Sequence, residues 1–257
     1  MIAWLTHHLP RPDDAPAVPG LLPGRYAGGA EMTDAAYLAA APEPVTLYGP
    51  DQWRETVDAD LIIVTGTDAL TAEAMLTLAE RHPVVFLHHA QTRSAERAAL
   101  LNGARRVIVH TPAHEQHERR WLTQPEWHHV LSPLDVTEIR SEPQRQHLAL
   151  WAQRSHPLKN RLGSAFWAAQ HGLPFVAMTD ADRADVLAAM ATAEWFVHLP
   201  LALESESRAV MEAVLSGCRV HVNAHVGIAS VERWDDPAWL AEQVSTAADE
   251  FWRVSLA

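Results

Sequence analysis

Two glutamates separated by seven residues are the most informative feature of the chain. Glu204 follows an apolar, strand-like run, and Glu212 lies within a helix predicted to begin near Ser207 and Arg208. The first turn of a helix has free backbone N–H groups, which together with the helix dipole favour an anion such as phosphate. Glu204 can accept hydrogen bonds from ligand hydroxyls, and Glu212, about one and a half turns into the helix, can reach others. The spacing therefore predicts a site for a ligand that combines phosphate and hydroxyl groups.

A pair of basic residues precedes these glutamates along the chain. Arg154 and Lys159 follow a strand predicted over residues 147–151, with four residues between them. Arginine offers phosphate a planar fork of donors, and lysine offers it a point charge. The pair predicts a cationic turn that binds the phosphate part of the same ligand.

Two further groups lie in the first half of the chain. Gly28 and Gly29 precede a predicted helix, and glycines let a backbone approach a ligand closely. His88 and His89 end the apolar run VVFL. Strand alternation predicts that one of these histidines points inward and the other outward, without saying which. A histidine that only makes structural hydrogen bonds is an equally good interpretation.

Two other clusters have the form of metal sites, but we predict no bound metal. Asp180 and Asp182 form a D-x-D sequence at a predicted helix start, where aspartates cap N–H groups. His110, His114 and His117 have helical spacing, as zinc ligands can have, but a proline among them and acidic neighbours predict a surface helix.

Short apolar runs alternate with helical patterns along the whole chain. Strands in the first half are predicted over residues 2–5, 45–48, 61–64, 84–87 and 107–109, with helices over residues 69–81 and 94–102. The second half continues with strands over residues 147–151, 174–178, 195–199 and 219–223, and helices over residues 162–171, 184–193, 208–216 and 237–252. This rhythm predicts an α/β protein with two doubly wound, Rossmann-like domains, joined by a linker over residues 135–146. Ligands bind at the carboxyl ends of such strands.

The composition is that of a globular protein. The 257 residues are 48% hydrophobic and carry a net charge of −12. This charge argues against a protein that coats nucleic acid non-specifically. Residues 93–161 differ, with eleven basic and seven acidic residues. This local positive charge has two interpretations, an anion-binding cleft or an ordinary solvated surface of mixed charge. With Cys218 as the single cysteine, no membrane-length apolar run and no leader-like start, we expect a cytoplasmic protein without disulfides or a membrane span.

Residues 196–228 resemble the E-x7-E signature of the retaining GT-B glycosyltransferases, the large family 4-like group that includes sucrose synthases and mannosyltransferases. Beyond Glu204 and Glu212, the run MEAVLSGCRV resembles the family's LEAMACGxPV, and Gly227 lies in its GG region. The run Gly28–Glu31 resembles a GG-A-E sequence of the family. The chain is unusually short for this family and has Ser205 where the family has a glycine.

The resemblance implies a GT-B fold, with an acceptor domain over residues 1–140 and a nucleotide-sugar donor domain over residues 141–257, whose last helix can pack back on the first domain. It implies a metal-independent, hexosyltransferase-type enzyme (EC 2.4) that uses a UDP-, GDP- or other nucleotide sugar. Arg154 and Lys159 would clamp the donor diphosphate, Glu204 would position the sugar and Glu212 the ribose. A histidine at position 88 or 89 would lie near the reacting centre, and Gly28 and Gly29 near the donor phosphate.

The sequence leaves the acceptor and the oligomeric state open. One candidate acceptor is a small molecule or cell-envelope precursor. The other is a hydroxylated base of viral DNA, which would place the enzyme in the host cytoplasm and require the base to leave the helix stack. An alternative function is that of a GT-B protein that is no transferase, either epimerase-like or a non-catalytic nucleotide-sugar binder.

Overall fold

The computed structural model describes residues 1–6, 29–49, 51–56, 58–66, 70–89, 91–92, 94–122 and 125–257. The chain divides into two compact units. The first unit comprises Met1–Pro133 and Thr246–Ala257, and the second unit comprises Leu134–Ser245. The last twelve residues thus belong with the beginning of the chain.

The first unit contains a parallel sheet with the strand order β2-β1-β3-β4-β5-β6 among its described residues. Its strands are β1 (Ile2–Thr6), β2 (Val45–Tyr48), β3 (Leu61–Thr65), β4 (Val84–Leu87), β5 (Arg106–Val109) and β6 (Glu126–His129). Strands β1, β3, β4 and β5 are buried at every position, as expected for a parallel sheet that is covered on both faces. Strand β6, with the sequence EWHH, was not predicted because this edge strand is partly exposed and has no apolar run.

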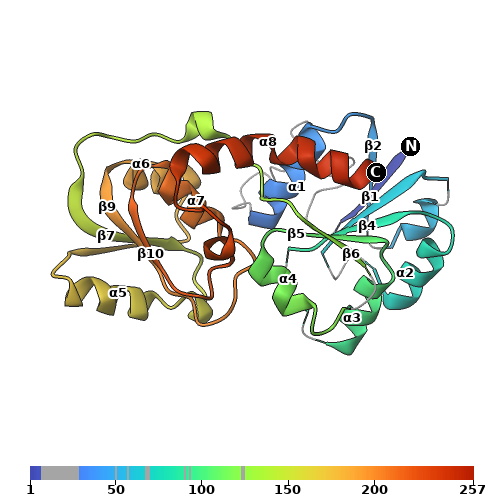
Figure 1. The fold of residues 1–257 in the computed structure, drawn as a ribbon, viewed down its shortest axis with the longest axis horizontal. Coiled ribbons are helices and arrows are strands. Elements are labelled where there is room, and N and C mark those ends of the chain that lie inside the picture. Colours follow the sequence, from blue (N-terminus) through green and yellow to red (C-terminus); the bar gives the residue numbers. More distant parts are fainter. Residues whose placement is uncertain are drawn as a thin grey trace. The chain divides into compact units, whose positions relative to one another are not determined.

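Helices cover both faces of this sheet (Figure 1). The helices of the first unit are α1 (Gly29–Ala39), α2 (Ala72–Ala79), α3 (Ala95–Asn102), α4 (Pro112–Glu118) and the end of α8 (Pro237–Leu256). Successive side chains of β1 point to opposite faces, so that Trp4 packs with Tyr37 of α1 and Phe251 of α8, whereas Leu5 packs in the cluster formed by α2 and α3.

The end of helix α8 is an integral part of the first unit. The rings of Tyr37 and Phe251 stack with their centroids 4.1 Å apart, and Trp252 Nε1 donates a hydrogen bond to the backbone oxygen of Tyr37 (2.8 Å). Buried Arg106 donates from Nη1 to the backbone oxygen of Val254 (3.0 Å). Helix α8 therefore completes one hydrophobic face of the first sheet.

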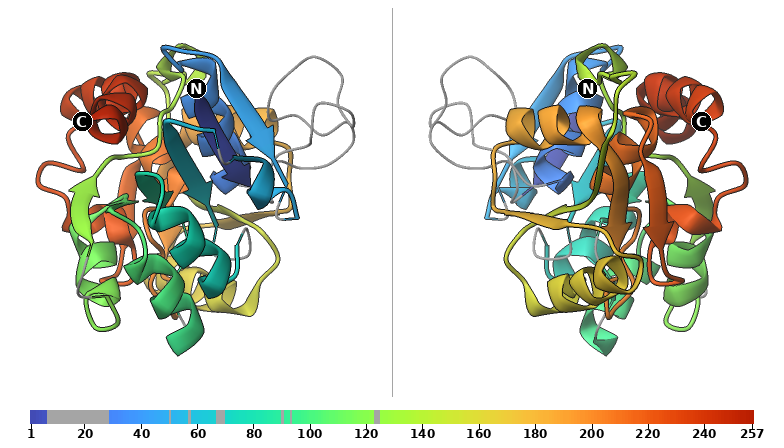
Figure 2. Two further views of the ribbon diagram at one scale, coloured as in Figure 1. Left: turned by 90° about the vertical axis from the view of Figure 1, so that its right-hand side faces the viewer. Right: turned by 90° about the vertical axis from the view of Figure 1, so that its left-hand side faces the viewer.

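The second unit contains a parallel sheet with the order β10-β9-β7-β8. Its strands are β7 (Gln146–Gln153), β8 (Phe175–Thr179), β9 (Ala193–His198) and β10 (Arg219–Val222). Helix α5 (Arg161–Gln170) covers one face, and α6 (Arg183–Thr192) and α7 (Arg208–Leu215) cover the other (Figures 1 and 2). Because all strand pairs are parallel, their carboxyl ends lie at one edge of the sheet.

Short 3-10 turns complete the two units: η2 (Trp53–Thr56), η3 (Val136–Glu138), η4 (Pro157–Lys159) and η5 (Gly227–Ser230). Turn η4 follows the carboxyl end of β7, and η3 lies in the segment predicted as a linker. None of the helices in the described part of the chain combines the length and apolar character that crossing a membrane requires.

Candidate functional site

The predicted cationic turn lies at the carboxyl end of β7. Arg154 directly follows the strand and is exposed, and Lys159 ends η4. Asn160 adopts the left-handed conformation (φ 52°, ψ 52°), and its side chain bonds in two directions. Its Oδ1 accepts from Gly163 N at the start of α5 (3.1 Å), and its Nδ2 donates to Leu199 O just after β9 (2.7 Å). These bonds fix the cationic turn to the end of the neighbouring strand.

Backbone hydrogen bonds hold the segment that carries Glu204. Glu204 N donates to His225 O (2.7 Å), Gly227 N donates to Glu204 O (2.9 Å), and Glu204 forms an isolated parallel bridge with Val226. A Cβ atom at position 227 would lie only 2.3 Å from Ser205 O and 2.5 Å from Glu204 O. Gly227 is therefore required for the close approach of two backbones that places Glu204.

The Glu204 carboxylate lies between a lysine and a histidine. Its Oε1 is 3.0 Å from Lys159 Nζ and 2.7 Å from Nε2 of the buried His198. An ionised carboxylate only accepts hydrogen bonds, so His198 carries a proton on Nε2. Burial raises the pKa of Glu204, but His198 and Lys159 outweigh this effect and lower that pKa to about 2. The three side chains form a pre-arranged polar group at the carboxyl end of the second sheet.

Helix α7 begins next to this group, without a side-chain cap. Ser207 at the N-cap position has φ 83° and ψ 83°, and its side chain makes no capping hydrogen bond. Its Oγ is buried without a hydrogen-bond partner within the described part of the chain. Because the Ser207 side chain does not cap this helix start, the first turn of α7 and its helix dipole suit an anion.

Glu212 is held inside the second unit by an arginine that the sequence did not point to. Its Oε1 accepts from Arg183 Nε (2.9 Å), and Arg183 also pairs with Glu138. The Glu212 side chain is only 7% exposed. Arg183 thus orients this carboxylate on the second turn of α7.

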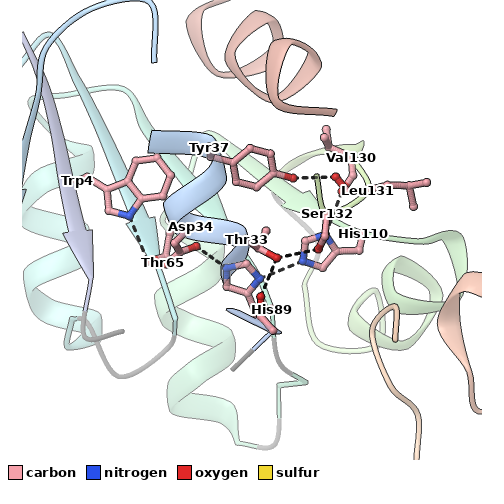
Figure 3. A network of polar contacts seen from close by, with 11 residues as sticks. Trp4, Thr33, Asp34, Tyr37, Thr65, His89, His110, Val130, Leu131 and Ser132 are labelled. Carbon is pink, nitrogen blue, oxygen red and sulfur yellow. Dashed lines mark hydrogen bonds and ion pairs between the residues drawn. The ribbon is translucent and has the colours of Figure 1, made fainter. Parts of the chain in front are cut away.

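In the first unit, His89 lies between Asp34 and His110 (Figure 3). His89 Nε2 is 2.7 Å from Asp34 Oδ1, His89 Nδ1 is 3.0 Å from His110 Nε2, and His110 Nδ1 is 2.9 Å from Val130 O. The carbonyl oxygen only accepts, so His110 donates from Nδ1 and, when neutral, accepts at Nε2 from His89. The hydrogen bonds therefore run from His89 through His110 to the carbonyl oxygen of Val130, and the other ring nitrogen of His89 contacts the buried Asp34 carboxylate.

His88 belongs to a second, fully buried cluster. His88 Nε2 is 3.2 Å from Glu118 Oε2, and His114 Nε2 is 3.9 Å from Glu118 Oε1. Thr92 N donates to both carboxylate oxygens, at 3.0 and 3.1 Å. Burial lowers the pKa of His88, and Glu118 opposes this only in part. For Glu118, burial raises the pKa, but His88 and Thr92 lower it overall.

Comparison with known proteins yields matches among solved structures. No protein-family model and no curated protein matches the chain. Sucrose-phosphate synthase from Thermosynechococcus elongatus matches with a TM-score of 0.62 at 14% identity, covering 99% of this chain and 94% of that chain. AviGT4, a glycosyltransferase involved in avilamycin A biosynthesis, matches with a TM-score of 0.59 at 14% identity, covering 99% and 91%. Anabaena HepE in complex with UDP-glucose matches with a TM-score of 0.56 at 15% identity, covering 99% and 94%.

The chain has the GT-B fold. Within the second unit of this GT-B chain, the structure brings Lys159 and Glu204 into contact and places both close to the start of α7. Arg154 lies at the same end of the sheet. Gly29 begins α1, whereas Gly28 lies outside the described residues.

Sequence reasoning missed several residues of the GT-B chain that complete these clusters. His198 has a recognisable signal, because it ends a strand six residues before Glu204. Arg183, Asp34 and Glu118 have none, because their contacts with Glu212, His89 and His88 cross 29 to 55 residues of sequence.

Three local expectations are wrong. The helix with His114 is exposed on one face only: its first residue, Pro112, is exposed, whereas His114 is fully buried and its ring stacks on that of His88. His88 and His89 do not alternate between inside and outside, because β4 ends at Leu87 and both rings turn into buried clusters.

The third concerns the D-x-D sequence. Asp180 does not cap helix α6. It has φ 51°, and its Oδ1 accepts from Ser155 N (3.0 Å), so it stabilises the turn after β7 instead. Asp182 occupies the N-cap position without a capping hydrogen bond.

Proposed function

We propose that this protein is a retaining glycosyltransferase that takes the sugar of a nucleoside-diphosphate sugar and transfers it to a hydroxyl acceptor. The observation that carries the proposal is the contact of Lys159 Nζ with Glu204 Oε1 at 3.0 Å, near a helix start that the Ser207 side chain does not cap. A cation suited to phosphate, a carboxylate suited to hydroxyl groups and the start of a helix lie within one small region of the second unit.

This region suits the charge distribution of such a donor. Lysine has three N–H donors, so Lys159 can keep its contact with Glu204 and still donate to a phosphate oxygen. Arg154 adds a second cation from the same turn, and the start of α7 adds backbone N–H groups and the helix dipole. Glu204 stays ionised and accepts hydrogen bonds from sugar hydroxyls, since its pKa is about 2.

In the proposed reaction, the bond between the anomeric carbon and the diphosphate oxygen breaks while the acceptor oxygen bonds to the same carbon. The acceptor proton leaves with the diphosphate or passes to solvent. Negative charge grows on the leaving diphosphate, and fixed cations and N–H dipoles stabilise that charge electrostatically. Lys159, Arg154 and the start of α7 would supply this stabilisation without a metal ion, and Glu212 would bind the ribose.

Uridine nucleotides are the first donors to test, because HepE was crystallised with UDP and with UDP-glucose. Thermal-shift and calorimetric titrations would compare UDP, GDP, ADP and their glucose conjugates. We expect one nucleoside diphosphate to bind, with at least a tenfold loss, equivalent to about 1.4 kcal/mol, in Lys159→Ala and in Arg154→Ala.

Arg219→Ala provides a matched control. Arg219 is an exposed cation at the start of β10, at the opposite end of the same sheet, so its removal should leave nucleotide affinity unchanged. Equal affinity in wild type, Lys159→Ala and Arg154→Ala would refute the donor site.

The activity itself requires a product assay. We expect release of the nucleoside diphosphate to depend on an added hydroxyl acceptor, and the new glycosidic bond to keep the donor's anomeric configuration by NMR. A small molecule or envelope precursor is the first acceptor class, because the net charge of −12 opposes DNA binding. Transfer to hydroxylated DNA, with steep salt dependence, would favour the second acceptor class.

The same assays separate the alternative functions. Nucleotide-sugar binding without transfer or hydrolysis would indicate a non-catalytic binder, and isomerisation of the sugar would indicate an epimerase.

A further inference from the structure

The cluster of His88, His114 and Glu118 plays no part in the proposed donor site. The three side chains come from the end of β4 and from helix α4, and all are fully buried. One potential ligand atom from each of the three side chains lies within 4.8 Å of those of the other two. Among the described residues, the ion-pair partners of Glu118 are all histidines. Within the described part of the chain, this buried carboxylate therefore has no lysine or arginine as an ion-pair partner.

We propose that these three residues form a binding site for one divalent transition-metal ion, with zinc as the favoured ion. Imidazole nitrogens and a carboxylate are a ligand set that zinc commonly takes, and hard cations such as magnesium prefer oxygen ligands alone. Zinc bound by one carboxylate and two neutral imidazoles has a net charge of +1. The bound ion would thus compensate the buried negative charge of Glu118.

The distances suit a tetrahedral ion. Zinc lies about 2.0–2.2 Å from nitrogen and oxygen ligands, so neighbouring ligand atoms are roughly 3.3 Å apart. His88 Nε2 is 3.2 Å from Glu118 Oε2, and His114 Nε2 is 3.9 Å from the other oxygen, Oε1. His88 Nδ1 and Nε2 make no well-aligned hydrogen bond within the described part of the chain, despite complete burial. An ion would satisfy one of these nitrogens once the two imidazole rings, which stack with their centroids 5.0 Å apart, turn their planes towards it.

The surrounding elements hold the ligands in place. His114 and Glu118 are four residues apart and therefore lie on one face of α4. Thr92 N–H donates to both carboxylate oxygens and so fixes the carboxylate plane, as outer hydrogen-bond partners of metal ligands do. The ion would link the end of β4 to helix α4 and stabilise this part of the first unit.

The proposal concerns metal content and stability, so its test does not depend on transferase activity. Full-length protein without a histidine tag would be stripped with a chelator, then titrated with zinc by calorimetry and analysed by mass spectrometry for bound metal. We expect one zinc per chain and a higher thermal midpoint on binding. With cobalt in place of zinc, we expect the intense visible bands of a four-coordinate site.

Variants assign the ligands. His114→Gln and Glu118→Gln should each lower zinc affinity about 100-fold or more and abolish the cobalt bands. His129→Gln, which removes a partly exposed histidine of the same unit, should change neither. Absence of stoichiometric zinc in wild-type protein would overturn the proposal even if the variants failed to fold. Zinc binding that survives in folded His114→Gln and Glu118→Gln would overturn it as well.

Discussion

Both units place a glutamate next to histidines, but they compensate its charge differently. In the second unit, Glu204 is 14% exposed and has Lys159 and His198 as partners. In the first unit, Glu118 is fully buried and has two buried histidines and the Thr92 N–H group. The Glu204 group includes a permanent cation and can still contact a ligand from its exposed side, whereas Glu118 has no lysine or arginine as an ion-pair partner among the described residues.

This difference indicates what each unit can do with its carboxylate. A lysine beside Glu204 lets the same group of residues contact phosphate and hydroxyls, which suits a substrate that must enter and leave. Burial around Glu118 strengthens every electrostatic interaction and excludes water, which suits an ion that stays. Four comparisons between pairs of variants test the contrast, from the largest expected effect to the smallest.

The largest effect should come from His88→Ala. In metal-free protein the substitution leaves buried Glu118 with one partner fewer and creates a cavity, so we expect a loss of about 3–5 kcal/mol in the free energy of unfolding. Lys159→Ala should cost about 1 kcal/mol or less, because Lys159 is partly exposed and Glu204 keeps His198. Urea unfolding in the presence of a chelator measures both. Similar losses in the two variants would contradict the contrast.

Next in size is the pH dependence created by Glu204. Its pKa falls from 4.5 in the unfolded chain to about 2 in the folded one, which corresponds to at most about 3 kcal/mol. This stabilisation is complete above pH 4.5 and is lost as the pH falls towards 2. Glu204→Gln should therefore flatten the dependence of the free energy of unfolding on pH between pH 5 and 2. Urea unfolding at each pH measures this dependence.

Glu142→Gln is the control for that profile, because it removes an exposed carboxylate of the same unit. A Glu204→Gln profile that stays parallel to wild type would mean that Glu204 is not held ionised by its neighbours.

A smaller effect is expected from Gly227→Ala. The new methyl group would collide with the backbone oxygens of Ser205 and Glu204, and the required shift should cost about 1–3 kcal/mol and weaken nucleotide binding. Gly172→Ala is matched to it: φ is 68°, but nothing lies within 4 Å of the new Cβ, so only stability should fall. Unchanged nucleotide affinity in Gly227→Ala would show that the backbone position of Glu204 does not matter for the ligand.

The smallest effects concern helix starts. Ser94 caps α3 by accepting from Arg97 N, so Ser94→Ala should cost about 1 kcal/mol. Ser207 makes no such bond and has φ 83°, so Ser207→Gly should change stability by less than about 0.5 kcal/mol. Thermal unfolding compares the two, and a large loss in Ser207→Gly would show that its hydroxyl is a structural cap after all.

The sequence predicted those parts of the fold that depend on local pattern. Strands β1, β3 and β4 are continuous apolar runs, and they were found because burial on both faces demands such runs. The start of α7 and the turn that ends at Lys159 were found from residue order. Edge strand β6 was missed, because half-exposed EWHH has no pattern that distinguishes it from a loop.

The candidate sites were predicted less completely than the fold. The order of residues pointed to Glu204 and Lys159, but not to the long-range bonds at Asn160 and Gly227 that bring them together. The orientation of His88 and His89 was predicted wrongly because the alternation of side chains ends with strand β4. Beyond the strand, each ring points to a buried carboxylate, Glu118 or Asp34, that is distant in sequence.

Helix α8 has a consequence for how the chain folds during its synthesis. The face of the first sheet that contains Ile2 and Trp4 is covered in part by Phe251 and Trp252. A ribosome therefore makes strand β1 long before it supplies this cover, because Trp4 precedes Phe251 by 247 positions. Until then the nascent chain exposes an unfinished apolar surface, and we expect it to depend on chaperones. Truncation within α8 should for the same reason destabilise strand β1, although the two are far apart in sequence.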